Sequence, residues 1–268
     1  MFATVLTDCQ DDNALGRVTT RLGSLLDTGV HTVRVSSDLN GRAELEAAGN
    51  LVDILDAAEG RPGVVLVNVA PRSGAAHDAW SNGTPFGYFR YGDTLVVSTI
   101  DGVVLSLVKK LGLVDEIQVI DLEKVATDEL DHADLAYSPE HIIGSQFRSF
   151  DFLPRVAAHL YRHGTVTAMP RSLADTPDVA NTVWWIDNFG NCKTTLVADD
   201  IVHRPDEPIE TTFGPIGYRY ALRNVPNGEV GIVVGSSGIG TTRFLELVLQ
   251  GGSAAEKLGI GVCDTVLS

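Results

Sequence analysis

Short β-rich runs alternate with amphipathic segments over roughly the first 165 residues, and this alternation constrains the fold more than any other feature. Val64–Val69 has the pattern of a buried strand, since Asn68 is its only polar residue. Ala43–Ala57 places its apolar residues on one helical stripe. The other expected strands are Phe2–Thr7, Thr32–Val35 and Thr94–Ser98, and the other expected helices are Asn13–Leu26 and Gly102–Leu111. This repetition predicts an α/β fold with a mostly parallel sheet and helices on both faces.

The texture of the sequence changes near Gly164–Thr176, where Gly, Pro and Ser accumulate and helical periodicity ends. Short strand-like runs separated by turn-forming clusters follow. They are Thr182–Ile186, Thr194–Val197, Tyr218–Leu222, Val230–Val234 and Phe244–Leu249. This pattern predicts a smaller antiparallel β domain. We therefore expect an N-terminal α/β domain over residues 1–168, a linker over 169–178 and a C-terminal β domain over 179–268.

The charge balance disfavours several classes of function. The 268 residues include 20 Lys+Arg against 35 Asp+Glu, and the resulting formal charge of −15 disfavours nucleic acid and membrane surfaces as partners. With 44% hydrophobic residues, the chain can bury a sizeable core. We see no signal peptide and no apolar run near the roughly 20 residues that span a membrane. Cys9, Cys192 and Cys263 form no disulfide framework. These features predict a soluble, cytoplasmic protein.

Two motifs invite a metal or phosphate interpretation. His159 and His163 stand four apart on an expected helix, but no Glu lies between them and no third ligand is evident, which favours a helix-surface pair over a metal site. The segment 235–242 matches a phosphate-binding loop except that Thr241 stands where Lys is required. A Gly/Ser loop that binds a ligand carboxylate is the better interpretation.

Asp8 follows the first expected strand, in the sequence Thr7-Asp8-Cys9-Gln10-Asp11-Asp12. Ligands of open α/β sheets bind just outside the carboxyl ends of strands, where an Asp can accept two hydrogen bonds from a ribose diol. The alternative is helix capping, which Asp11 or Asp12 also offers. Both interpretations of Asp8 stay open from local sequence.

Several stretches in order carry a family resemblance. They are Leu6–Asp8 with the helix around Gly16, Val69–Gly74, Gln146–Asp151 with Val156–His159, Ile186–Thr194, and the tail segments Ser253–Gly259 and Gly261–Asp264. The most specific is the Asp-Asn-Phe-Gly-Asn run that begins at Asp187. Together they resemble the family of S-adenosylmethionine (SAM)-dependent halogenases (chlorinases and fluorinases) and SAM hydroxide adenosyltransferases.

The resemblance implies a Rossmann-like N-terminal domain, a C-terminal β-barrel domain and a homotrimer that holds SAM between the N-domain of one subunit and the C-domain of the next. The implied reaction is displacement at the ribose 5′ carbon by water, chloride or fluoride, with methionine as the leaving group. SAM is then a substrate, and neither a cofactor nor a metal is expected.

By match to the family, Asp8 would hold the ribose hydroxyls and Asp187 the methionine ammonium. Phe189 and Asn191 would contact the adenine, and Ser236 or Ser237 the methionine carboxylate. Pro71 and Phe147 complete the substrate-binding residues that the resemblance implies.

The nucleophile pocket departs from the family pattern. Hydroxide-using members carry an Asp, an Arg and a His, where this chain has Ala70, His77 and Arg148. His77 would act as general base and Arg148 would stabilise hydroxide. Ser73 and Ser149, beside Phe147, match the hydroxyl donors of halide-using members. Water is slightly favoured over halide, and a non-catalytic adenosyl or nucleoside binder is the alternative from another class.

Overall fold

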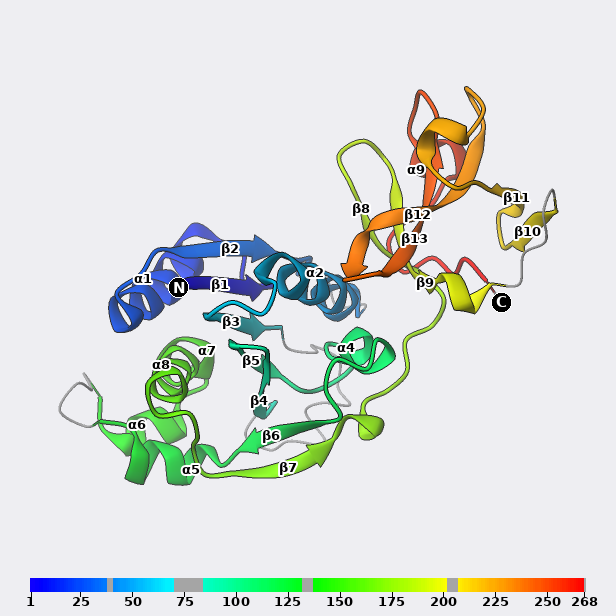
Figure 1. Ribbon diagram of the computed structural model, residues 1–268. Helices are drawn as coiled ribbons and strands as arrows, with labels where there is room; N and C mark the ends of the chain where they lie inside the picture. The colour runs from blue at the N-terminus through cyan, green and yellow to red at the C-terminus, as the bar shows by residue number, and fades with distance from the viewer. Residues whose placement is uncertain (38–40, 70–83, 132–136, 202–206, 268) are drawn as a thin grey trace. The chain divides into compact units, whose positions relative to one another are not determined.

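The structure, a computed structural model, describes residues 1–268 apart from 38–40, 70–83, 132–136, 202–206 and 268. The chain divides into two units, Met1–Pro177 and Asp178–Ser268 (Figure 1). Part of the segment expected to be a linker belongs to the first unit, because Ala168–Ser172 forms a strand that pairs with Glu116–Ile120. No helix in the described part of the chain is long and apolar enough to cross a membrane.

The first unit is built on a sheet with the order β2-β1-β3-β5-β4-β6-β7. Its strands are β1 (Phe2–Thr7), β2 (Val30–Arg34), β3 (Gly63–Asn68), β4 (Phe86–Tyr91), β5 (Thr94–Thr99), β6 (Glu116–Ile120) and β7 (Ala168–Ser172). The neighbours β2, β1, β3 and β5 pair in parallel, whereas β4, β6 and β7 join through antiparallel pairings. The expected largely parallel sheet is confirmed, and its three antiparallel pairings lie on the β7 side.

Helices cover both faces of this sheet because its central strands are buried on both faces. Ala3 and Val5 of β1 belong to one core with Leu66 of β3 and residues of α1 and α8. Leu6 and Val65, which point to the opposite face, are equally buried, and α2 contacts β1, β3 and α4. The helices are α1 (Asp12–Leu26), α2 (Arg42–Ala58), α4 (Ser106–Lys110), α5 (Leu122–Lys124), α6 (Pro139–Gly144), α7 (Arg148–Asp151) and α8 (Leu153–His163), with a π-helical turn at Val125–Glu129 and a 3₁₀ turn at Leu173–Asp175. The helix expected from Gly102 begins only at Ser106.

The second unit contains a six-stranded sheet in the order β10-β11-β12-β13-β9-β8. Its elements are β8 (Val183–Ile186), β9 (Cys192–Val197), β10 (Pro208–Thr211), β11 (Gly214–Tyr218), β12 (Val230–Ile239), β13 (Thr242–Leu249) and α9 (Ala254–Leu258), with 3₁₀ turns at Ala198–Asp200 and Leu222–Asn224. The pairings are antiparallel except for a short parallel one between β11 and β12. The prediction of a strand over Tyr218–Leu222 is wrong, because β11 ends at Tyr218.

The second sheet is open, which corrects the β-barrel expected from the resemblance. A barrel requires the two edge strands to pair with each other. In the described residues, β10 and β8 are the edges of the sheet and no pairing joins them. The larger hydrophobic cluster of this unit lies on one face, where Val183, Leu245 and Leu247 pack with Ala254 of α9, and a smaller one contains Val225, Val233 and Val248.

The buried interior of the first sheet makes a stability prediction. Leu66 of β3 is 0% exposed, so Leu66→Ala should lower the free energy of unfolding by about 2–5 kcal/mol through lost burial and a residual cavity. Urea unfolding followed by circular dichroism measures the change. The control Leu222→Ala, at a side chain that is 44% exposed, should change it by less than about 0.5 kcal/mol. Equal effects of the two variants would contradict a close-packed sheet interior.

Candidate functional site

Polar side chains gather where β1 and β3 end in the first unit. The Thr7 hydroxyl accepts hydrogen bonds from the Cys9 backbone N–H and from Asn68 Nδ2, both at 3.1 Å. The Asp8 backbone N–H donates to the Asn68 carbonyl at 3.4 Å. Asp8 is only 3% exposed, and its Oδ1 lies 3.7 Å from Cys9 Sγ. This strand end therefore places a buried carboxylate just beyond the carboxyl end of β1.

The capping interpretation belongs to Asp11 and not to Asp8. Asp11 is the N-cap of α1, and its Oδ1 accepts a hydrogen bond from the Ala14 backbone N–H at 2.9 Å. Asp8 lies before this cap, at the end of the strand, so α1 does not account for its carboxylate.

The short helix α7 carries two candidate residues and is anchored at its start. Ser145 Oγ accepts from the Phe147 backbone N–H at 3.0 Å and donates to Asp151 Oδ2 at 2.7 Å. Phe147 itself is 61% exposed, and Ser149 is half-buried. The Asp151 carboxylate also pairs with Arg21 of α1 at 3.1 Å. The position of α7 is thus fixed from both ends.

Arg148 is half-buried, and its guanidinium contacts the protein. Its Nη2 donates to the Thr84 carbonyl at 3.1 Å, and its Cζ lies 5.7 Å from the centroid of the Phe86 ring. Burial lowers the pKa of this guanidinium from its usual value. A guanidinium has five N–H donors, so the bond to Thr84 leaves others for a second role.

Ser73 and His77 of the nucleophile pocket and Pro71 of the substrate-binding set lie outside the described residues, as does Ala70. Their proximity to Arg148 and Ser149 stays a prediction.

In the second unit, the run from Asp187 to Asn191 forms the turn between β8 and β9 and is organised by one carboxylate. Asp187 Oδ1 accepts from the backbone N–H groups of Phe189 and Asn191, at 2.8 and 2.9 Å. Asp187 Oδ2 accepts from Asn191 Nδ2 at 2.9 Å. Gly190 has φ +81°, and a Cβ there would lie 2.0 Å from Ser253 Oγ, so only glycine fits. The motif therefore has a structural reason for its Asp, Gly and second Asn.

The electrostatics of the turn favour an ionised Asp187. Burial raises its pKa, but the hydrogen bonds from Asn191 and Phe189, with the charge of Lys193, outweigh that effect and leave the pKa below its ordinary value. Phe189 is 71% exposed, so within this unit it is not a core residue. Asn191 Oδ1 accepts no hydrogen bond from the described residues and is open to an amine donor.

Ser236 and Ser237 lie on β12 and not on a phosphate-binding loop, because a strand continues on both sides of the hairpin turn at Gly240–Thr241. The Ser236 hydroxyl and backbone N–H both contact Glu246 Oε1, at 3.2 and 3.0 Å. Ser237 is 1% exposed, and its Oγ accepts from Lys193 Nζ at 2.6 Å. The two candidate serines therefore have neighbours of opposite charge.

Sequence reasoning missed Lys193 and Glu246, which line this part of the second sheet. Glu246 is 7% exposed and stands directly opposite Lys193 in the β13–β9 pairing. Lys193 Nζ also lies 5.5 Å from the centroid of the buried Trp184 ring. The available signal is Glu246 inside the otherwise apolar run Phe244–Leu249, which is unusual for a buried strand, whereas Lys193 is followed by two threonines and gives no such signal.

The histidine pair lies on α8, as expected from its spacing. The rings of His159 and His163 have centroids 4.4 Å apart. Burial and the neighbouring His163 lower the pKa of His159. Among the residues that the structure describes, no group of three His, Cys, Asp or Glu side chains is placed to hold a metal ion.

Comparison with known proteins agrees with the two units and with the Asp187 turn. Residues 181–267 match the family model of the SAM hydroxide adenosyltransferase C-terminal domain. An uncharacterized conserved protein from Thermotoga maritima is similar in structure, with a TM-score of 0.66 and 18% identity over 100% of both chains. A conserved hypothetical protein from Thermus thermophilus has a TM-score of 0.58 and 19% identity, over 98% of this chain and 97% of that chain. No curated protein matches the chain.

The match of the C-terminal unit supports a SAM-related activity in general. It agrees with the resemblance to the SAM hydroxide adenosyltransferases that the sequence indicates. The two solved structures share less than a fifth of their residues with this chain and show the fold alone.

The Asp187 turn predicts a stability effect that depends on pH. Because its pKa is lowered on folding, Asp187 stabilises the fold above the ordinary Asp pKa of about 3.9, and this contribution is lost as the pH falls through the folded pKa. Asp187→Asn should therefore lower the free energy of unfolding at neutral pH by about 1–3 kcal/mol and much less near pH 3. Denaturant unfolding at the two pH values measures this. Asp199→Asn, at an exposed side chain of the same unit, is the control and should have no such effect; a loss that is the same at both pH values would contradict an ionised Asp187.

Proposed function

We propose that this protein binds SAM and catalyses nucleophilic substitution at the ribose 5′ carbon, releasing methionine, with water as the nucleophile and adenosine as the product. The observation that carries the proposal is the family match over residues 181–267, which includes the turn organised by Asp187. The sulfonium of SAM is already a good leaving group and needs no proton. The protein must instead supply a rigidly held ribose and a desolvated nucleophile in line with the departing sulfur.

The strand end of the first unit supplies the ribose contact in this proposal. The buried Asp8 carboxylate accepts hydrogen bonds from the two ribose hydroxyls. The backbone hydrogen bond from Asp8 to Asn68 holds the main chain from which this carboxylate projects. A bidentate contact of this kind orients the 5′ carbon, which is the main requirement of an in-line displacement.

The turn of the second unit supplies the contacts to the rest of SAM. The ionised Asp187 attracts the methionine ammonium, the exposed ring of Phe189 stacks on adenine, and Asn191 Oδ1 accepts from the adenine amino group. For the methionine carboxylate, the charges favour Ser237, whose hydroxyl lies beside the Lys193 ammonium. Ser236 is disfavoured because Glu246 would repel a second carboxylate.

The nucleophile is assigned to the pocket around α7. His77 takes a proton from the attacking water, and Arg148 stabilises the hydroxide that forms. The half-buried guanidinium of Arg148, held by Thr84, is suited to an anion because its charge is poorly solvated. Halide is the alternative nucleophile. In that route the hydroxyls of Ser73 and Ser149 donate hydrogen bonds to the halide beside Phe147, and no base is needed.

A non-catalytic adenosyl or nucleoside binder is the second candidate. It is favoured by one observation: each Asp187 oxygen already accepts a hydrogen bond inside the turn, so the motif is explained without a ligand. We retain the homotrimer and the cytoplasmic location as proposals that rest on the resemblance and the sequence.

Incubation with SAM at several chloride and fluoride concentrations, followed by chromatography, separates these functions. We expect adenosine and methionine in equal amounts, at a rate independent of halide. A halogenated nucleoside would establish the halide route, and unchanged SAM with measurable binding would establish the binder. His77→Ala should abolish adenosine formation while leaving SAM binding intact, and unchanged turnover in that variant would remove His77 from the mechanism.

The role of Asp187 toward the ligand is tested by comparing two ligands. Asp187→Asn should weaken SAM binding about tenfold more than adenosine binding, because only SAM carries the methionine ammonium. Titration calorimetry of both ligands measures the difference, with Asp199→Asn as the matched control. Equal losses for SAM and adenosine would show that Asp187 acts through the turn alone.

A further inference from the structure

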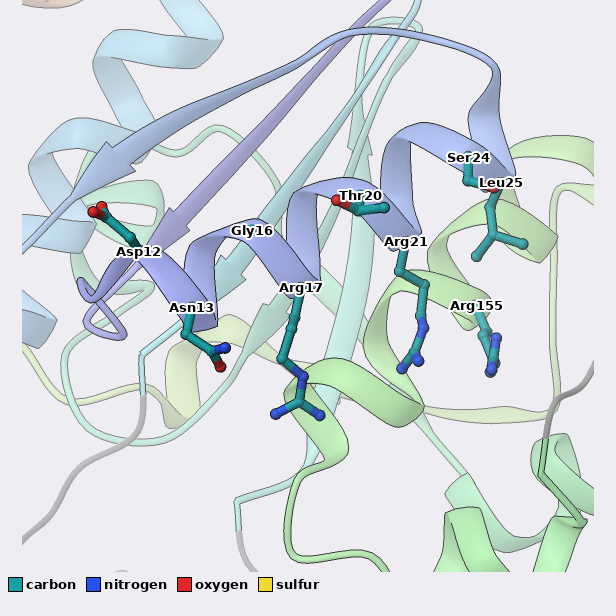
Figure 2. A pocket seen from close by; sticks show the side chains of 9 residues that line it. All are labelled: Asp12, Asn13, Gly16, Arg17, Thr20, Arg21, Ser24, Leu25 and Arg155. Carbon is teal, nitrogen blue, oxygen red and sulfur yellow. The ribbon is translucent and has the colours of Figure 1, made fainter.

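A groove on the first unit, which begins at Asp12 and Asn13 at the start of α1, is lined by arginines. Its volume is about 670 Å³, and it follows one face of α1 to the start of α8. Figure 2 shows the side chains of Arg17 and Arg21 on α1 and of Arg155 on α8, which project to the same side of α1. Asn13, Thr20 and Ser24 complete the polar part of the lining.

The placement of these arginines is unfavourable for the empty protein. Arg17 and Arg21 are four residues apart on one helix face, where like charges destabilise a helix. Arg155 lies in the first turn of α8, at the positive end of the helix dipole. The chain as a whole carries a formal charge of −15, so a general excess of basic residues does not account for the cluster.

Arg155 is the least satisfied member of the cluster. It is 8% exposed, and its Nε is buried without a hydrogen-bond partner. No hydrogen bond of its side chain to any described residue occurs. A guanidinium stays charged in a protein, so this is a buried cation that a ligand can satisfy.

The protein's own anions satisfy only part of this charge. Arg21 pairs with Asp151 at 3.1 Å, and the Asp151 carboxylate also accepts from Ser145. Arg17 stacks on the Phe150 ring, with its Cζ 4.4 Å from the ring centroid. The carboxylate of Asp12, at the end of the groove, is 99% exposed and lies 3.8 Å from Arg34. Positive charge therefore exceeds negative charge within the groove.

We propose that this groove binds a phosphate-bearing small molecule, whose phosphate group is held by Arg17, Arg21 and Arg155. Guanidinium groups bind phosphate oxygens in a bidentate fashion. The double negative charge of a phosphate is balanced by several guanidinium groups, whereas the single charge of a carboxylate needs one. The volume lies within the range of small-molecule pockets and is larger than a lone phosphate needs. Asn13, Thr20 and Ser24 then contact the polar remainder of the ligand. The inference is independent of the proposed reaction, since SAM is a cation at its sulfonium and the arginines repel it.

The test is calorimetric titration of the full chain with inorganic phosphate, ribose 5-phosphate and, as an uncharged control, ribose, at constant ionic strength. We expect the two phosphates to bind and ribose not to bind. Arg155→Met should weaken phosphate binding about tenfold or more while leaving the melting temperature equal or higher, because it replaces an unpaired buried cation with an apolar chain. Arg223→Gln, at an exposed side chain of the second unit, changes the net charge by the same amount and should have no effect.

A second variant keeps the test decisive if Arg155→Met does not fold. Arg17 is exposed, and its guanidinium stacks on the Phe150 ring. The variant Arg17→Gln should therefore fold normally and weaken phosphate binding several-fold. Tighter binding of ribose 5-phosphate than of inorganic phosphate identifies a phosphate ester as the ligand class, and equal binding identifies free phosphate. Absence of binding for both, or binding that neither arginine variant weakens, overturns the proposal. SAM binding should be the same in all of these variants, so a failed SAM titration of the wild type affects only the proposed reaction.

Discussion

Burial of β1, β3 and β5 on both faces is the constraint on which the first unit depends. A strand covered by helices on each side can carry few polar side chains in its interior without large desolvation costs. Polar chemistry is therefore confined to the strand ends, where Thr7, Asp8 and Asn68 bond to one another. The same constraint explains why the buried Asp8 carboxylate lies at the end of β1 and not within the strand.

The second unit accommodates its polar side chains in a different way. One face of its open sheet carries a hydrophobic core around Val183 and Leu245, and the other face combines charged side chains with buried apolar ones such as Phe244 and Val248. Lys193 and Glu246 stand opposite each other on that face, and each bonds a different serine of β12. The charge of Lys193 also helps to lower the pKa of the Asp187 carboxyl in the neighbouring turn.

Local sequence predicted the parts of the molecule that local physics determines. The strand–helix alternation predicts β1, α1, β2, α2, β3 and β5 because these segments carry short β-rich runs or helical patterns. The segment that forms strand β7 is predicted as part of a linker because it contains Pro170. A sheet tolerates proline only where a backbone N–H is not needed, and β7 is an edge strand. The open second sheet could not be predicted, because closure depends on pairing between β8 and β10, which are distant in sequence. Register decides the Lys193–Glu246 pairing in the same non-local way.

The arginine groove and the candidate catalytic helix share a structural element, which connects the two proposals. Arg21 holds Asp151, and Asp151 together with Ser145 fixes α7, the helix that carries Arg148 and Ser149. A phosphate bound by Arg21 competes with the Asp151 carboxylate for the same guanidinium. This competition moves α7 only if the helix has a second stable position. A ligand shifts the equilibrium between two positions only by the difference in its affinity for them. The bond between Arg148 and Thr84 opposes such a shift. The hydrogen bond between Arg148 and Thr84 therefore determines how much a ligand bound in the groove would affect the proposed nucleophile pocket.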